Sequence, residues 1–312
     1  MSIVNKEIRS GSDLITTHAQ TRQGFLNFAL YKNQLSTPYI DQAKVLMQDL
    51  KTITKPEEVV DLVNSRSPII AAAGISDKAT NYLDENDLDD AIQQLIKKHL
   101  KPAGPLFREE LVYRFLLNRG DALGGKMRNL VGHIAQGLLV QRLSSALTNR
   151  GIKHLFFSNK AKRWESSYGY TNFEDVKAVS WTFQNQPYIL GFNMNIPKIG
   201  KNIDINLFKG TKEEFPKDLP KQPNKAIMFG ELKGGIDPAG ADEHWKTGNS
   251  ALERDRKAFN YNIKTSFVGA AIAEDMANEI YQQLQDGTLS NAANLYKDNQ
   301  LTEYVQWIIE GC

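Results

Sequence analysis

The chain has 312 residues, of which 41% are hydrophobic and 24% charged, and this composition is typical of a globular protein rather than a disordered one. The amino terminus lacks the apolar segment of a secretory signal, and no apolar stretch is long enough to span a bilayer. We therefore expect a cytoplasmic protein without a membrane partner. The single cysteine, Cys312, excludes a disulfide framework or a thiolate cluster within one chain, so a metal site must use oxygen and nitrogen ligands. A net charge of +2 does not by itself argue for nucleic acid.

The first third of the chain predicts helices. Apolar residues recur with helical spacing in the ranges 40–50, 87–100 and 108–117. Proline and glycine in the range 101–105 mark the clearest break between helices in this part of the chain. We therefore expect a helical subdomain at residues 1–105 and a second domain at residues 106–312.

A glycine-broken segment at residues 119–126 nearly matches the phosphate-binding P-loop. Met127 stands where that motif has serine or threonine, and the residues before the glycines predict a helix rather than a strand, so the sequence argues against an NTPase. A long amphipathic helix is expected at residues 127–149. Asp121 and Arg128 flank the glycines, where backbone N–H groups can meet a phosphate, although a role in the turn or in a dimer surface is favoured.

The pattern changes to strands from residue 154 onward. Short segments rich in β-branched and aromatic residues are separated by turn residues, and they predict strands at 154–158, 178–183, 188–193, 203–208 and 226–230. A helix at 241–260, a strand at 266–272 and helices at 275–284 and 301–309 follow. This order predicts an α/β fold with a mixed central sheet flanked by helices.

The most informative pattern is Glu231-Leu-Lys233, at the end of the predicted strand 226–230. Side chains two apart on a strand point to the same face, so Glu231 and Lys233 can converge on one reacting centre. Asp204 lies on the face of its predicted strand opposite the apolar residues. If this strand pairs with 226–230, Asp204 can lie beside Glu231 and Lys233. Two carboxylates favour Mg²⁺, which prefers oxygen ligands and keeps several waters. Because Lys233 can orient a water or help deprotonate it, these groups suit phosphodiester hydrolysis. The alternative is a surface ion pair.

This arrangement resembles the PD-(D/E)xK nucleases, although Ile203 stands where that superfamily has proline. The sixteen residues 231–246, with the ranges 201–204 and 119–125, resemble the AvaI/BsoBI group of type II restriction endonucleases, and the similarity extends over most of the chain. The resemblance implies a PD-(D/E)xK core with a DNA-embracing helical subdomain, a homodimer around double-stranded DNA, and Mg²⁺ as cofactor. It also implies cleavage of both strands at the palindrome CYCGRG after its first cytosine, leaving 5′ overhangs, and a cognate DNA methyltransferase that shares the site.

The resemblance also implies roles for four residues. Asp204 and Glu231 would hold the metal, and Lys233 would act with the nucleophilic water. His244 falls at the family's additional active-site histidine, where an imidazole can take a proton near neutral pH. Capping or packing of the helix that contains His244 is the alternative.

Three residues are candidates for DNA contact. Asp237 can accept a hydrogen bond from cytosine N4 in the major groove, or it can serve as a turn residue before Pro238. Lys78 matches a family lysine that contacts DNA, either at a guanine or at a phosphate. Lys201 is expected beside a phosphate near the active site.

Two other functions compete with a restriction endonuclease: a structure-specific nuclease of DNA repair or recombination with the same core, and a non-catalytic DNA-binding factor. The sequence does not identify the dimer surface, the number of metals, or the residues that read the degenerate YR positions.

Overall fold

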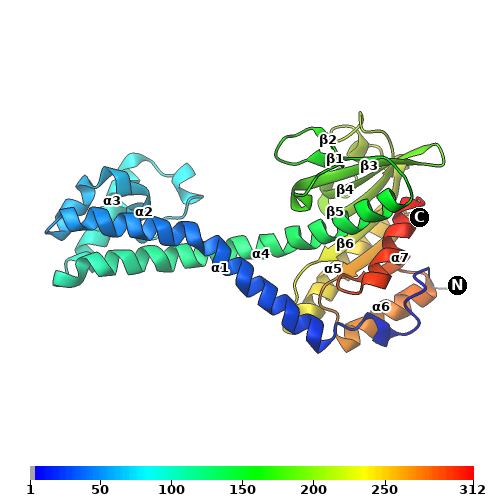
Figure 1. Cartoon of the computed structure of the whole chain (residues 1–312), viewed down its shortest axis with the longest axis horizontal. Coiled ribbons are helices and arrows are strands. Elements are labelled where there is room, and N and C mark those ends of the chain that lie inside the picture. The colour runs from blue at the N-terminus through cyan, green and yellow to red at the C-terminus, as the bar shows by residue number, and fades with distance from the viewer. Residues whose placement is uncertain (1–3) are drawn as a thin grey trace. The chain divides into compact units, whose positions relative to one another are not determined.

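The computed structural model describes residues 4–312, without the side chains of Arg128 and Asn129, so the expected role of Arg128 lies outside the described residues. The chain forms two compact units, one from the residues up to Phe25 with Leu130–Cys312, the other from Leu26–Asn129. Two long helices, α1 (His18–Asp49) and α4 (Phe107–Asn149), contribute to both units (Figure 1). In the described part of the chain, no helix is long and apolar enough to cross a membrane. The expected division at residue 105 falls within the Leu26–Asn129 unit, and separate roles for its two sides stay a prediction.

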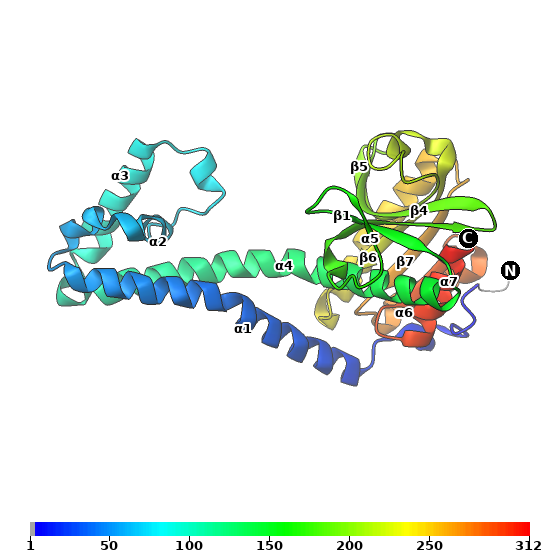
Figure 2. The same ribbon diagram turned by 45° about the horizontal axis from the view of Figure 1, so that its top comes forward.

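The Leu26–Asn129 unit is helical, as the sequence predicts. Helices α2 (Arg66–Ala72) and α3 (Glu85–Leu95) pack with parts of α1 and α4 around a core that includes Leu46, Ile92 and Phe115 (Figure 2). Asp84 caps α3, because its side chain accepts a hydrogen bond from Asp87 N at 3.0 Å. The predicted helix 87–100 is confirmed by α3 and the helical turn Ile96–Leu100 that follows it. The helices predicted at 40–50 and 108–117 are also helical in the structure, but as parts of the much longer α1 and α4.

The predicted glycine break at residues 119–126 is wrong. Helix α4 continues through it, and this conformation also differs from the strand, loop and helix of a P-loop. Glycine inside a helix costs about 1 kcal/mol relative to alanine. Packing of the helical turns before and after the glycines offsets this cost, since Phe115 and Leu143 of α4 are both fully buried. A Cβ at Gly120 or Gly124 would meet nothing within 4 Å, so no close contact requires these glycines.

The rest of the chain forms an eight-stranded sheet with the order β2-β1-β3-β4-β5-β6-β7-β8. Neighbours from β2 to β6 are antiparallel, whereas β7 and β8 run parallel to β6. The strands are β1 (His154–Ser158), β2 (Trp164–Ser166), β3 (Val176–Phe183), β4 (Gln186–Ile196), β5 (Lys201–Lys209), β6 (Ala226–Lys233), β7 (Lys264–Gly269) and β8 (Asn291–Asn294). All predicted strands are confirmed, while the short β2 and β8 were not predicted.

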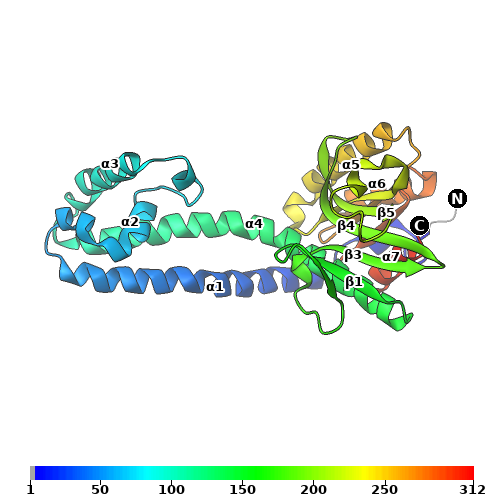
Figure 3. The same cartoon turned by 90° about the horizontal axis from the view of Figure 1, so that it is seen from above.

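Helices cover both faces of the sheet. The second half of α4 and helix α7 (Asp298–Ile309) pack on one face, in a core that includes Leu139, Phe156 and Ile308. Helices α5 (Ala241–Ala258) and α6 (Glu274–Asp286) lie together on the other face (Figure 3). The mixed sheet between helices confirms the predicted fold class.

We expect Phe156→Ala to lower the free energy of unfolding by about 3–5 kcal/mol, because it leaves a cavity in this core. The Phe156 ring is fully buried, with its centroid 5.0 Å from that of Tyr170. Urea denaturation would measure the loss. Tyr168→Ala is the control, since Tyr168 is 95% exposed, and an equal loss in both variants would contradict the assignment of the core.

Candidate active site on strands β5 and β6

Antiparallel pairing of β5 with β6 brings the three predicted catalytic residues together. The register pairs Ile205 with Gly230, which places Asp204 opposite Glu231. Asp204 Oδ2 accepts a hydrogen bond from the backbone N–H of Leu232 at 3.0 Å and lies 3.5 Å from Lys233 Nζ. Lys233 Nζ also donates to Glu231 Oε2. One ammonium therefore contacts both carboxylates.

One carboxylate of the site is buried while Asp204 and Lys233 are partly exposed, and this burial changes the electrostatics of the site. Glu231 is 5% exposed. Burial and the nearby charge of Asp204 raise the pKa of Glu231 to about 7, against the opposing effect of Lys233. Burial by itself would lower the pKa of Lys233, but Glu231 and Asp204 outweigh it and raise that pKa above its usual value. The lysine stays charged, and the cluster carries excess negative charge whenever both carboxylates are ionised.

The donor set fits a hard divalent cation. Asp204 and Glu231 supply oxygen ligands from adjacent strands, and the excess negative charge of the cluster favours a cation. Among the described residues, no group of three or more His, Cys, Asp and Glu side chains could hold a metal. Two carboxylates leave most coordination positions of an ion open to water, and Mg²⁺ is an ion that usually retains several waters.

The loop after Lys233 passes close to α4. A Cβ at Gly234 would lie 2.4 Å from Val131 O and 2.8 Å from Ala135 Cβ, so glycine is needed for this approach. His244 lies against the same loop, since a Cβ at Gly235 would be 3.2 Å from its Nε2. The His244 side chain is exposed in the first turns of α5. The structure thus places His244 beside the loop that follows Lys233, and its role as a base stays a prediction.

Asp237 lies exposed in this loop, and its Oδ1 accepts a hydrogen bond from the N–H of Ala239 at 3.0 Å. This contact stabilises the turn Pro238–Gly240, in agreement with the structural role expected for an aspartate there. The carboxylate has a second oxygen, Oδ2, so a turn role does not prevent it from accepting a hydrogen bond from a base.

The two candidate lysines lie on different units. Lys201 is exposed at the start of β5, three residues before Asp204. Lys78 is exposed in the Leu26–Asn129 unit, directly after Asp77, whose Oδ1 accepts a hydrogen bond from Arg119 Nη1 at 2.6 Å. Arg119 is itself buried, so the ion pair fixes the backbone next to Lys78.

Sequence reasoning missed one charged residue close to the site. Asp255 of α5 is fully buried, and burial raises the pKa of its carboxyl to about 6 against the opposing charges of Arg254 and Arg256. The sequence could have indicated this burial, because Asp255 continues the helical spacing of the buried residues Trp245, Gly248 and Leu252.

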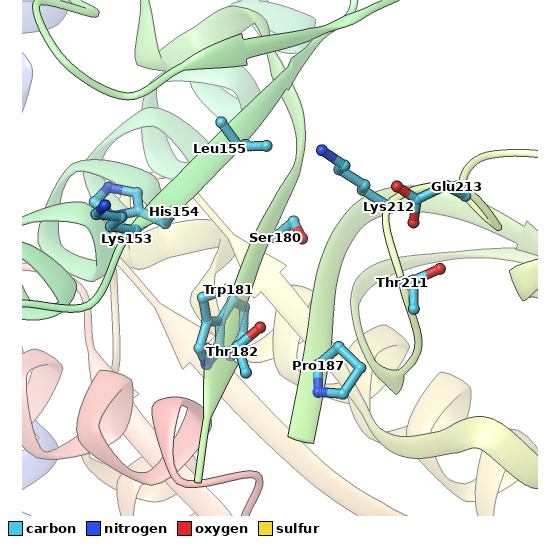
Figure 4. Close-up of a pocket in the computed structure, with 10 residues that line it drawn as sticks. All are labelled: Lys153, His154, Leu155, Ser180, Trp181, Thr182, Pro187, Thr211, Lys212 and Glu213. Carbon is cyan, nitrogen blue, oxygen red and sulfur yellow. The ribbon is translucent and has the colours of Figure 1, made fainter. Parts of the chain in front are cut away.

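A surface pocket elsewhere on the sheet is a separate feature. It is lined by residues at the start of β1, in β3, at the start of β4 and in the segment that follows β5: Lys153, His154, Leu155, Ser180, Trp181, Thr182, Pro187, Thr211, Lys212 and Glu213 (Figure 4). Both ring nitrogens of His154 already have partners, Ser144 Oγ at 2.8 Å and Ile152 O at 3.1 Å. None of the lining residues belongs to β6 or α5, so this pocket is not part of the carboxylate and lysine cluster.

A mixed sheet with a carboxylate on one strand and an acid-x-lysine pair on its antiparallel neighbour defines the PD-(D/E)xK class of nuclease. Comparison with known proteins agrees, because residues 4–311 match the family model described as restriction endonuclease BsobI. The type II restriction enzyme AvaI of Nostoc sp. and that of Anabaena variabilis are each 43% identical over 308 residues, which cover 97% of this chain and 98% of theirs. The type II restriction enzyme BsoBI of Geobacillus stearothermophilus is 42% identical over 313 residues, covering 97% and 96%. The chain belongs to this AvaI/BsoBI family of restriction endonucleases.

The pKa of Glu231 predicts how stability depends on pH without metal. The folded protein holds this proton up to about pH 7, whereas an ordinary glutamic acid releases it near 4.5. The folded state therefore binds more protons between these values, and the free energy of unfolding should fall as pH rises from about 4.5 to 7. Urea unfolding in EDTA should show a weaker decline for Glu231→Gln.

The matched control is Glu243→Gln, since Glu243 is exposed on α5 and should leave the decline unchanged. A decline in Glu231→Gln as steep as that in the wild type would contradict the assignment.

Proposed function

We propose that this restriction endonuclease hydrolyses both strands of duplex DNA in a Mg²⁺-dependent reaction at a CYCGRG-like palindrome, leaving 5′ overhangs. The observation that carries the chemistry is the contact of Lys233 with both Asp204 and Glu231. The recognition sequence and the overhang rest on the resemblance of residues 231–246 to the AvaI/BsoBI group. Family membership over nearly the whole chain favours this function over a repair nuclease or a non-catalytic DNA-binding factor.

In the proposed mechanism, a bound Mg²⁺ would lower the pKa of a water and stabilise charge on the phosphate. Asp204 and Glu231 would hold this ion from two strands. The raised pKa of Lys233 keeps its ammonium protonated at neutral pH, so it orients the attacking water and offsets charge rather than removing a proton. The Leu232 N–H fixes the Asp204 carboxylate by its hydrogen bond.

A proton acceptor for the water must then be another group. His244 is the candidate, because its exposed imidazole lies beside Gly235, two residues after Lys233. A neutral imidazole can take a proton near neutral pH.

The same proposal covers the partners. A palindrome has two-fold symmetry, so a homodimer can present one active site to each strand. The helical region at residues 1–105 would embrace the duplex, with Lys78 contacting a guanine or a phosphate and Lys201 a phosphate near the cut. A DNA methyltransferase of the same specificity would protect cytoplasmic DNA from cleavage.

We expect Glu231→Gln to lower cleavage at least about 100-fold while duplex affinity is retained, because the change removes one metal ligand and no DNA-facing charge. Plasmid DNA with Mg²⁺ and sequencing of the ends measure cleavage, and gel shift in Ca²⁺ measures affinity. Glu243→Gln is the control and should cut normally.

The outcomes separate the alternatives. Preference for nicked or branched DNA over the palindrome would support a repair nuclease. Unchanged behaviour of Glu231→Gln, with no cutting by the wild type, would support a non-catalytic DNA-binding factor.

Asp237→Ala should lose about 1–3 kcal/mol of discrimination between cognate and random duplexes if the carboxylate contacts a base. Asp237→Ser is a matched variant, because serine can still cap the turn but is too short to reach a base edge. Competition binding would measure both. Loss of discrimination in both variants supports base contact, whereas normal discrimination by Asp237→Ser would assign Asp237 to the turn alone.

A further inference from the structure

Asp255 is a buried carboxylate without a hydrogen-bond partner in the described part of the chain. Its side chain is fully buried, and neither Oδ1 nor Oδ2 accepts a hydrogen bond from the described residues. A buried charge that is unsatisfied in this way is unfavourable for folding, and such groups in native structures are commonly explained by function, a water or an ion.

The neighbouring arginines supply Asp255 with an ion pair but with no hydrogen bond. Arg254 Nη2 lies 3.4 Å from Asp255 Oδ1 but does not form a hydrogen bond with it. The Arg256 guanidinium is engaged elsewhere, with Thr265 Oγ1 at 3.1 Å and a Glu253 carboxylate oxygen at 3.1 Å.

Contacts on either side show which part of β6 Asp255 faces. Before it on α5, a Cβ at Gly248 would lie 3.6 Å from Lys233 Cε. After it, the Phe259 ring centroid is 5.2 Å from that of Phe229. Since side chains alternate along a strand, Phe229, Glu231 and Lys233 share this face of β6.

The spacing of residues along α5 and β6 is consistent with a position of Asp255 over Glu231. Four residues of helix, from Asp255 to Phe259, rise about 6 Å. Two residues of strand, from Phe229 to Glu231, cover about 6.6 Å. Asp255 therefore lies over Glu231, and charge coupling between Asp255 and both Glu231 and Asp204 agrees with this placement.

We propose that Asp255 is a third carboxylate of the divalent-cation site, which acts from helix α5 through Glu231 and through water, and raises the affinity of the site for the cation. It is a positioning residue rather than a ligand. Lys233 contacts Asp204 and Glu231, and Asp255, which forms an ion pair with Arg254, adds its charge from behind Glu231. A divalent cation would offset the excess negative charge of Asp204 and Glu231. This inference rests on the proposed metal-dependent function.

Asp255→Asn tests it, because asparagine keeps the size of the side chain and removes its charge. We expect the metal-free variant to melt at or above the wild-type temperature, since the buried charge is gone. Its affinity for Mg²⁺ should be about 10-fold weaker, as is usual when a group behind a metal ligand is changed. Titration of the melting temperature with Mg²⁺, and calorimetry with Mn²⁺, would measure the affinity without cleavage.

Glu253→Gln is the matched control on the same helix. Glu253 is half-buried and pairs with Arg256 and Tyr261, away from β6, so its metal affinity should equal that of the wild type. Asp255→Glu, which keeps the charge, should bind Mg²⁺ more tightly than Asp255→Asn.

Each outcome decides the proposal. Wild-type metal affinity in Asp255→Asn overturns it, and so does a loss of metal-free stability in that variant, because the carboxylate would then be structural. A wild-type protein that binds no divalent cation and cuts no DNA would refute the proposed function itself. Normal binding and cutting by both proteins would refute the role of Asp255 alone.

Discussion

The structure of the site depends on the pairing of β5 with β6. This register places Asp204 opposite Glu231, and the hydrogen bond from Leu232 N–H to Asp204 Oδ2 joins the two strands where the acidic groups meet. Enclosure then raises the pKa of Glu231, and Lys233 is the ammonium that contacts both carboxylates. A one-residue slip between the strands would send Asp204 to the other face and leave Glu231 without its neighbour.

Packing of helices on both faces of the sheet constrains the segments around the site. On one side, α4 approaches so closely that residue 234 must be glycine, which directs the chain from Lys233 into the loop containing Asp237. On the other side, α5 begins just after that loop and packs over β6 and β7, where Gly248 lies against Lys233 and Phe267. The short loop therefore links the proposed cleavage site directly to a proposed base contact, and movement of the loop on DNA would affect both.

Much of the fold could be predicted because local patterns and tertiary packing agree. The strands at 154–158 and 203–208 and the helix at 241–260 were recognisable from periodicity. Two misses have physical reasons. Glycines in the range 119–126 suggested a break, but packing of the flanking turns keeps α4 continuous. Strand β8 (Asn291–Asn294) consists of asparagine and alanine, which are uncommon in strands, and pairing with β7 rather than its own propensity makes it a strand.

The sequence by itself determined the chemical types at the site and their local geometry, because alternation along a strand puts Glu231 and Lys233 on one face whatever the rest of the chain does. It also indicated the family, through the long run of residues 231–246. The tertiary structure alone decided that Asp204 lies opposite Glu231, that His244 rests against the Gly235 loop, and that Asp255 is buried. Burial and contacts between distant segments arise from packing of the whole chain, and the pKa shifts that follow from them do not exist in any one segment of it.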